Sequence, residues 1–206
     1  MKQITDILPQ KNDKKRANLY IDGVFYSGVE KIVLLTENLH VGDFVDEKKL
    51  SEIIEESEYT SAVSKASNYI LKGSHTVKQV AGYLVKKGYG GKIAAKVIDK
   101  LQVYGYLDDG QFADSYVEIK SAKHGKRLLA AELRQKGIKE EYVESALLKV
   151  ENEDETALSI AKKYLKNKPL DIKTKQKCFR YVMSKGFSYE SAKYAVDKLF
   201  TDDIDF

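Results

Sequence analysis

A glycine that recurs at a fixed interval is the feature that most constrains the fold of this chain. Gly88, Gly137 and Gly186 each follow a lysine, and 49 residues separate each glycine from the next. Two equal intervals of this length indicate an internal repeat, and repeats of this size are typical of stacked helical units. The same 49-residue period should therefore appear in the apolar residues around each glycine.

The apolar residues do repeat with the glycines. Apolar side chains stand four and eight residues before each glycine, a spacing that places them on one face of a helix. Because glycine adopts left-handed backbone conformations without steric cost, it is suited to the end of that helix. Another apolar residue follows each glycine, and a new helix is expected two or three residues later. The equivalent positions are Val80, Leu129 and Cys178, then Leu84, Leu133 and Val182, then Tyr89, Ile138 and Phe187, and in the following helix Val97, Ala146 and Ala195.

One more helix is expected before each of these pairs. The stretches "EYTSAVSKASNYILKG", "GQFADSYVEIKSAKHG" and "DETALSIAKKYLKNK" have apolar residues at helical spacing. The chain is therefore predicted to be mainly α-helical, with three tandem three-helix repeats that form an elongated, curved array. The predicted repeats are residues 57–107, 108–152 and 153–206.

Residues 1–56 are predicted to form a small β-rich lobe and a linker helix. The stretch "NLYIDGVFYSG" contains two β-prone runs joined by Asp22-Gly23, a dipeptide typical of tight hairpins. Alternation along the first run places Leu19 and Ile21 on the same face. The stretches "KIVLLT" and "GDFVD" are predicted as further strands, and "KKLSEIIEESEYTSA" as a helix.

Three carboxylates in "GYLDDGQFADSYV" have several interpretations. Asp108, Asp109 and Asp114 could hold a metal ion or transfer protons, but acids of this kind also stand at the start of helices. Asp108 and Asp109 fall just before the expected first helix of the second repeat, and no metal-ligand spacing accompanies them. They are interpreted as helix caps, whose charge stabilises the N-terminal end of a helix by ~0.3–1 kcal/mol.

The other reactive residues favour a protein that is not an enzyme. The sequence contains no P-loop and no recognisable pair of nucleophile and base. Cys178 shares its repeat position with Val80 and Leu129, so it is predicted to be a core residue. His124, in "KHGK", is expected in an exposed loop, where a phosphate contact is a second interpretation. Tyr89 is expected in the core rather than as a platform for stacking bases.

The composition indicates the cellular compartment in which the protein is expected. A single cysteine excludes an intrachain disulfide and fits a reducing environment. No apolar run approaches the roughly 20 residues of a membrane span. The start of the chain, "MKQITDILPQKNDKK", lacks the apolar stretch of a signal peptide. We therefore expect a cytoplasmic protein that does not associate with membranes.

The charges of the chain are segregated along the sequence. The net charge is only +4, but residues 120–139 hold seven basic residues against one acid, and residues 162–185 hold nine against one. The acids collect in "EIIEESE", "ENEDE" and "TDDID". Such segregation builds positive faces that attract polyanions, although an ordinary solvated helix surface has a similar composition.

Four stretches together resemble one known family. They are "YILKGSHTVKQVAGYLVKKG", "GYLDDGQFADSYV", "KHGKRLLAAELRQKGI" and "KGFSYESAKYAV", and they cover residues 58–200. In these stretches the chain resembles the RecX family, bacterial regulators of the recombinase RecA. An acid is common in that family where this chain has Lys78, so a pairing made by that acid is not expected here. The β-rich lobe is similar to an N-terminal extension of some members.

The resemblance implies a role in DNA repair, recombination and control of the SOS response, without catalysis, cofactor or metal. Family members are thought to bind in the groove of the RecA–DNA filament and to inhibit recombination, strand exchange and coprotease activity. Some also bind DNA, so a general DNA-binding helical-repeat module is the alternative function. We expect a monomer that contacts RecA filaments, and single- or double-stranded DNA, through basic residues. The candidate contacts are Lys86, Lys87, Lys123, Lys126, Arg127, Arg134 and Lys136.

Overall fold

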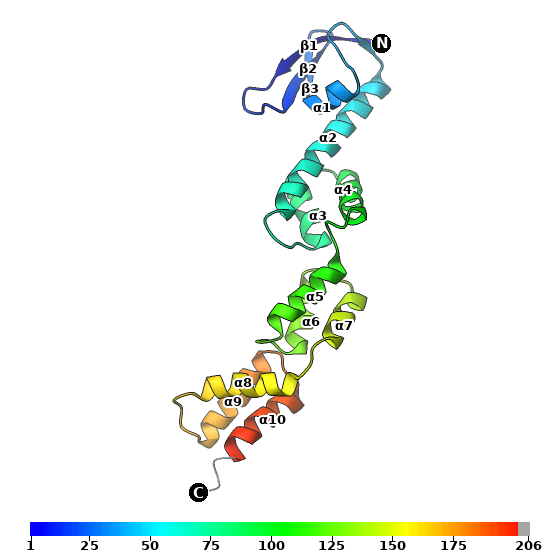
Figure 1. Ribbon diagram of the computed structural model, residues 1–206. Helices are drawn as coiled ribbons and strands as arrows, with labels where there is room; N and C mark the ends of the chain where they lie inside the picture. Colours follow the sequence, from blue (N-terminus) through cyan, green and yellow to red (C-terminus); the bar gives the residue numbers. More distant parts are fainter. Residues whose placement is uncertain (202–206) are drawn as a thin grey trace. The chain divides into compact units, whose positions relative to one another are not determined.

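The computed structural model describes residues 1–201, and within this range the chain contains ten helices and one small sheet (Figure 1). The chain divides into two compact units. The first comprises Met1–His75 and Gln79–Leu107. The second comprises Thr76–Lys78 and, among the described residues, those from Asp108 to Thr201. Each unit contains its own buried apolar clusters.

The first unit begins with an antiparallel four-stranded sheet. The strands are β1 (Lys2–Pro9), β2 (Arg16–Ile21), β3 (Val24–Glu30) and β4 (Phe44–Val45), in the order β3-β2-β1-β4. The β2–β3 hairpin turns at Asp22 and Gly23, whose φ angles are 51° and 80°. Positive φ at both positions matches the turn type that this dipeptide favours. Leu19 and Ile21 are buried as predicted.

The predicted strand "KIVLLT" is wrong, because Lys31–Thr36 forms the short helix α1. Val33 and Leu34 are both buried, whereas Ile32 and Leu35 are exposed. Two neighbouring residues of a strand point to opposite faces, so a strand could not have buried both against one core. A short apolar run without alternation fits either a strand or a helix. Burial against the sheet favours the helix here.

A single helix, α2 (Glu47–Ile70), follows the sheet and contains residue 56, where the lobe was expected to end. The Asp46 side chain caps it by accepting a hydrogen bond from the Lys49 backbone N–H. Further along α2, the buried Ser57 hydroxyl accepts from the Glu30 backbone N–H at 2.8 Å. Together with α3 (Val77–Lys86) and α4 (Gly91–Val103), α2 supplies the three helices expected of the first repeat.

Up to residue 201, the second unit contains six helices in two groups of three, as predicted. The first group is α5 (Asp109–Lys120), α6 (Lys126–Gln135) and α7 (Glu140–Leu148). The second is α8 (Glu153–Leu165), α9 (Ile172–Ser184) and α10 (Tyr189–Thr201). The Ser188 hydroxyl accepts from the Ser191 backbone N–H at 3.0 Å, which caps the start of α10.

The three repeated glycines end equivalent helices, which confirms the repeat. Their φ angles are 89° at Gly88, 86° at Gly137 and 86° at Gly186. Each glycine N–H donates to the carbonyl three residues earlier, at 2.9 to 3.0 Å. This left-handed ending satisfies helix carbonyls that would otherwise lack a partner.

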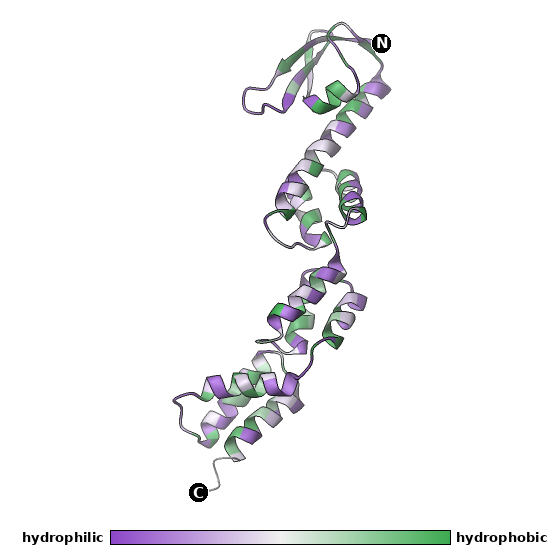
Figure 2. Ribbon diagram, viewed as in Figure 1, coloured by the Kyte–Doolittle hydropathy of each residue, from purple (hydrophilic) through white to green (hydrophobic). Residues whose placement is uncertain are grey.

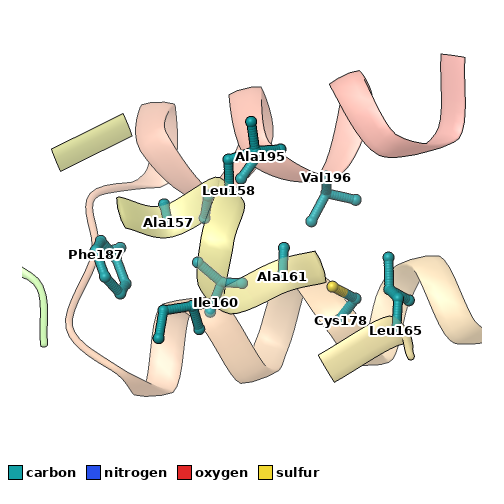
Figure 3. Close-up of a cluster of buried hydrophobic side chains, with 11 residues drawn as sticks. Ala157, Leu158, Ile160, Ala161, Leu165, Cys178, Phe187, Ala195 and Val196 are labelled. Carbon is teal, nitrogen blue, oxygen red and sulfur yellow. The ribbon is translucent and has the colours of Figure 1, made fainter. Parts of the chain in front are cut away.

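The predicted core positions are buried, except that Tyr89 is only half-buried. The residues four and eight positions before each glycine have no exposed surface. Figure 3 shows the cluster of the third repeat, where the Cys178 sulfur lies among Ala161 and Leu165. Cys178 is therefore a packing residue, as its repeat position predicted. Tyr89 is half-buried, and its hydroxyl donates to the Ser61 hydroxyl at 3.0 Å.

Hydrophilic residues interrupt hydrophobic ones along the helices, including the long helix α2 (Figure 2). The helices for which buried residues are given each combine buried and exposed positions. Within residues 1–201, none of the helices combines the length and the apolar character needed to cross a membrane.

Candidate functional site

The start of α6 is fixed by the turn at the end of α9. The Gly125 N–H donates to the Lys185 carbonyl at 2.9 Å, and the Arg127 N–H donates to the Gly186 carbonyl at 3.1 Å. A Cβ at Gly125 would overlap the backbone of Gly186 and Phe187. Glycine is therefore required here for close approach, and it places the first turn of α6 in a defined position.

The segment Thr76–Lys78 stands 49 residues before Gly125–Arg127 and contacts the end of α6, but through side-chain donors. The Thr76 hydroxyl donates to the Lys136 carbonyl at 2.9 Å, and Lys78 Nζ donates to the Gln135 carbonyl at 3.3 Å. Lys78 also packs against Gly137. The C-terminal end of a helix carries partial negative charge, so a lysine is favourable at position 78 and an acid would be repelled.

The two neighbouring aspartates have different roles. Asp108 accepts from the Gln111 N–H at 2.9 Å and caps α5, as predicted. Asp109 does not cap α5, because its carboxylate accepts from the N–H of Val77, the first residue of α3, at 2.9 Å. Burial raises the pKa of Asp109. The sequence could not reveal this partner, which lies 32 residues away in the chain.

An equivalent acid stands at the start of the third repeat. Glu153, the first residue of α8, accepts at 3.0 Å from the N–H of Lys126, the first residue of α6. The third carboxylate of the sequence motif, Asp114, pairs with Lys149 at 2.6 Å. No cluster of three or more His, Cys, Asp or Glu residues that could hold a metal ion occurs within residues 1–201.

The five predicted contact residues of the second repeat lie on α6 or next to its ends. We call them the α6 surface. Arg127 is exposed and forms no ion pair within residues 1–201. The first turn of α6 carries no acid of its own, although it carries Lys126 and Arg127. Cations oppose the helix dipole at that end, so they are not placed there to stabilise the helix. The α6 surface consists of Lys123, Lys126, Arg127, Arg134 and Lys136.

Two members of the α6 surface are already engaged. The Arg134 guanidinium binds both carboxylate oxygens of Glu140, which lowers the pKa of Glu140. Lys136 Nζ lies 5.3 Å from the ring centroid of Tyr116 and 6.0 Å from that of Phe112. Arg127 is therefore more available to a partner than Arg134, a difference that their spacing of seven residues did not reveal.

The remaining predicted contacts fall in two places. Lys123 is exposed in the turn after α5, and Lys126 is half-buried at the start of α6. Lys86 and Lys87 are exposed at the end of α3, where Lys87 Nζ lies 5.6 Å from the centroid of the Tyr83 ring. The last two residues belong to the first compact unit, and the α6 surface belongs to the second.

The expectation that His124 is exposed is wrong. Its side chain is only 20% exposed, and Nδ1 lies 3.5 Å from the Glu132 carboxylate. That carboxylate also accepts from the Tyr116 hydroxyl at 2.9 Å, and burial raises the Tyr116 pKa to about 12. The chain folds back after α5, because the His124 N–H donates to the Lys120 carbonyl. The sequence contained a signal, since His75 stands 49 residues earlier.

Comparison with known families agrees with this organisation. Residues 2–46 match the regulatory protein RecX N-terminal domain. Residues 108–147 match the second three-helix domain of RecX, and residues 151–196 match the third. The matched ranges contain the sheet and most of the α5–α7 and α8–α10 groups.

Individual relatives extend the similarity to nearly the whole chain. The regulatory protein RecX of Clostridium tetani is 36% identical, over 98% of this chain and 96% of the relative. That of Bacillus licheniformis is 33% identical, over 96% of this chain and 78% of the relative. A crystal structure of regulatory protein RecX superposes with a TM-score of 0.72 at 27% identity, covering 98% of this chain and 100% of that one.

Proposed function

Because the chain belongs to the RecX family of regulatory proteins, we propose that it regulates the RecA recombinase by binding the RecA–DNA filament. In this proposal the bound protein restrains strand exchange and coprotease activity without chemistry of its own. The α6 surface forms part of the contact. Its groups are guanidinium and ammonium cations, which bind carboxylates of a protein or phosphates of DNA.

The position of Arg127 is the observation that carries the proposal. Its backbone is fixed by the Gly186 carbonyl, while its side chain is exposed and without an ion pair within residues 1–201. A rigid backbone under a free guanidinium lowers the entropy that is lost when a partner binds. Ala131, exposed one turn further along α6, leaves room for a partner to approach the helix.

A general DNA-binding module is the second candidate, because the same cations would bind phosphates. The two functions differ in which component, DNA or recombinase, is needed to bind the protein. A DNA-binding module needs only the polyanion, and its affinity falls steeply with salt. A filament regulator needs the recombinase, so DNA without recombinase should retain much less of it.

The test is a pull-down of the purified full chain on three immobilised baits. They are recombinase filaments on single-stranded DNA, recombinase without DNA, and the same DNA without recombinase. We expect filaments to retain far more protein than naked DNA at physiological salt. Equal retention by naked DNA would overturn the proposal in favour of the general module.

A further inference from the structure

A groove between α9 and α10 is not explained by the proposed function. Its volume is about 480 Å³, and it lies entirely within the second compact unit. Apolar side chains and cations both line it. The apolar ones are Ile172, Phe179, Tyr189 and Val196, and the cations without a carboxylate partner within residues 1–201 are Arg180 and Lys193.

The apolar part of the groove is open to solvent. Ile172 is 79% exposed and Tyr189 is 56% exposed, whereas Val196 is buried beneath them. The Phe179 and Tyr189 rings meet edge to face with centroids 5.4 Å apart. Large apolar side chains that gather in one exposed depression are typical of binding sites, because burying them in a complex is favourable.

The charge of the groove is positive. Its lining contains three cations and one carboxylate, which leaves a net charge of +2. Lys175 is neutralised by Asp197 at 2.9 Å. Arg180 Nε donates to the Gln176 carbonyl of its own helix, and no carboxylate within residues 1–201 pairs with its guanidinium.

The other repeats show that helix packing does not require these residues. The positions 49 residues before Arg180, Tyr189 and Lys193 hold small or acidic residues, and those 98 residues before hold only small ones. The same helix pair is therefore built elsewhere without the exposed aromatic ring or the cations. The equivalent residues are Ala131, Glu140 and Glu144 in the second repeat, and Gly82, Gly91 and Ala95 in the first.

We propose that the α9/α10 groove docks an acidic peptide segment of a protein partner. An aliphatic or aromatic side chain of that segment fills the space over Val196, between Ile172 and Tyr189. Flanking carboxylates meet Arg180 and Lys193, where charge-assisted hydrogen bonds are strongest. The aliphatic side chains of Ile172 and Val196 in the lining favour an apolar side chain of a peptide over the phosphates and sugars of a nucleic acid.

The probe is a fluorescein-labelled peptide in which aspartates and glutamates flank a central Ile-Phe pair. Its binding to the full chain is followed by fluorescence anisotropy. A second peptide replaces the acids by their amides, and a labelled oligothymidylate represents single-stranded nucleic acid. We expect the acidic peptide to bind about tenfold or more tightly than the amide peptide, and more tightly than the oligothymidylate.

Variants locate the site. Arg180→Ala with Lys193→Ala, and separately Tyr189→Ala, should each weaken binding of the acidic peptide by about tenfold, since each removes an exposed part of the groove. The matched control is Lys162→Ala with Lys163→Ala, which removes the same charge from exposed positions on α8 outside the groove lining. The control should bind the peptide like the wild type.

Two results would overturn this inference. Equal loss of peptide binding in the groove and control variants would show that net charge alone attracts the peptide. Tighter binding of oligothymidylate, lost in the groove variants, would assign the groove to nucleic acid. Neither result depends on the recombinase, so the inference fails or stands separately from the proposed function.

Discussion

The Asp109 carboxylate accepts a hydrogen bond at 2.9 Å from the backbone N–H of Val77. Glu153 makes the equivalent contact with Lys126. In both cases the accepting carboxylate belongs to the first residue of a repeat's first helix. The donating N–H belongs to the first residue of the second helix in the preceding repeat. The acids at the repeat boundaries therefore hold helices together through hydrogen bonds. This structural role is missed if the pair of aspartates is interpreted as catalytic.

We predict that removing the Asp109 acceptor destabilises the chain. Asp109→Ala leaves the Val77 N–H without its partner and should lower the free energy of unfolding by about 1 kcal/mol. Asp109→Asn keeps an oxygen at the same place and should stay within about 1 kcal/mol of the wild type. Urea unfolding followed by circular dichroism measures both. Equal stability of the Ala and Asn variants would contradict the assigned role.

The raised pKa of Asp109 predicts the direction of a pH effect. Burial favours the protonated carboxyl in the folded state, so the folded chain binds a proton that the unfolded chain has released. The wild type should therefore lose stability as pH rises from the ordinary aspartate pKa of about 3.9 through the raised one. Asp109→Asn lacks this titration, and its stability relative to the wild type should increase over the same window. A difference in stability between Asp109→Asn and the wild type that stays constant across this pH window would contradict the prediction.

Two glycines with the same backbone conformation should respond differently to a methyl group. At Gly88 an added Cβ meets nothing within 4 Å. Gly88→Ala should therefore destabilise the chain only by the strain of a left-handed alanine, about 1 kcal/mol. At Gly186 the Cβ would lie 2.8 Å from Leu128 Cα and closer still to other Leu128 atoms. Gly186→Ala should therefore destabilise the chain by clearly more. Thermal melts of the two variants make the comparison, and similar melting temperatures would disprove the close approach.

Cys178 should behave as a core thiol. Burial raises its pKa to about 11, so at pH 8 only about a thousandth of the thiol is ionised. A thiol-reactive dye should label the native chain slowly and the urea-unfolded chain rapidly. Fast labelling of the native chain, at the rate of a free cysteine, would show that the cluster around Cys178 is not packed as described.

Local patterns made much of this fold predictable. The glycine period located the ends of α3, α6 and α9, because a left-handed ending and an apolar stripe leave marks in the sequence. The hairpin at Asp22 and Gly23 was predictable for the same reason. The six residues of α1 were not, since a short apolar run fits either structure until its burial is known.

Contacts between distant residues account for the rest. The Asp109–Val77 bond joins residues that are 32 positions apart, and His124 is half-buried beside Glu132 of α6 in its own repeat. Helical spacing placed Arg127 and Arg134 on one line, but it could not show that Glu140 binds Arg134. The sequence did not predict the α9/α10 groove, because its lining residues come from two helices and are not contiguous in the sequence.

The central claim is that the α6 surface contacts the recombinase filament, and strand-exchange inhibition tests it most directly. The variants are Arg127→Ala, Arg134→Ala and both together, with Lys162→Ala and Lys163→Ala as the charge-matched control. The double variant should need about tenfold more protein for half-inhibition, with Arg127→Ala giving most of the loss because Arg134 is already paired. Half-inhibition by the double variant at the wild-type concentration, across a range of salt and with unchanged melting, would contradict the account.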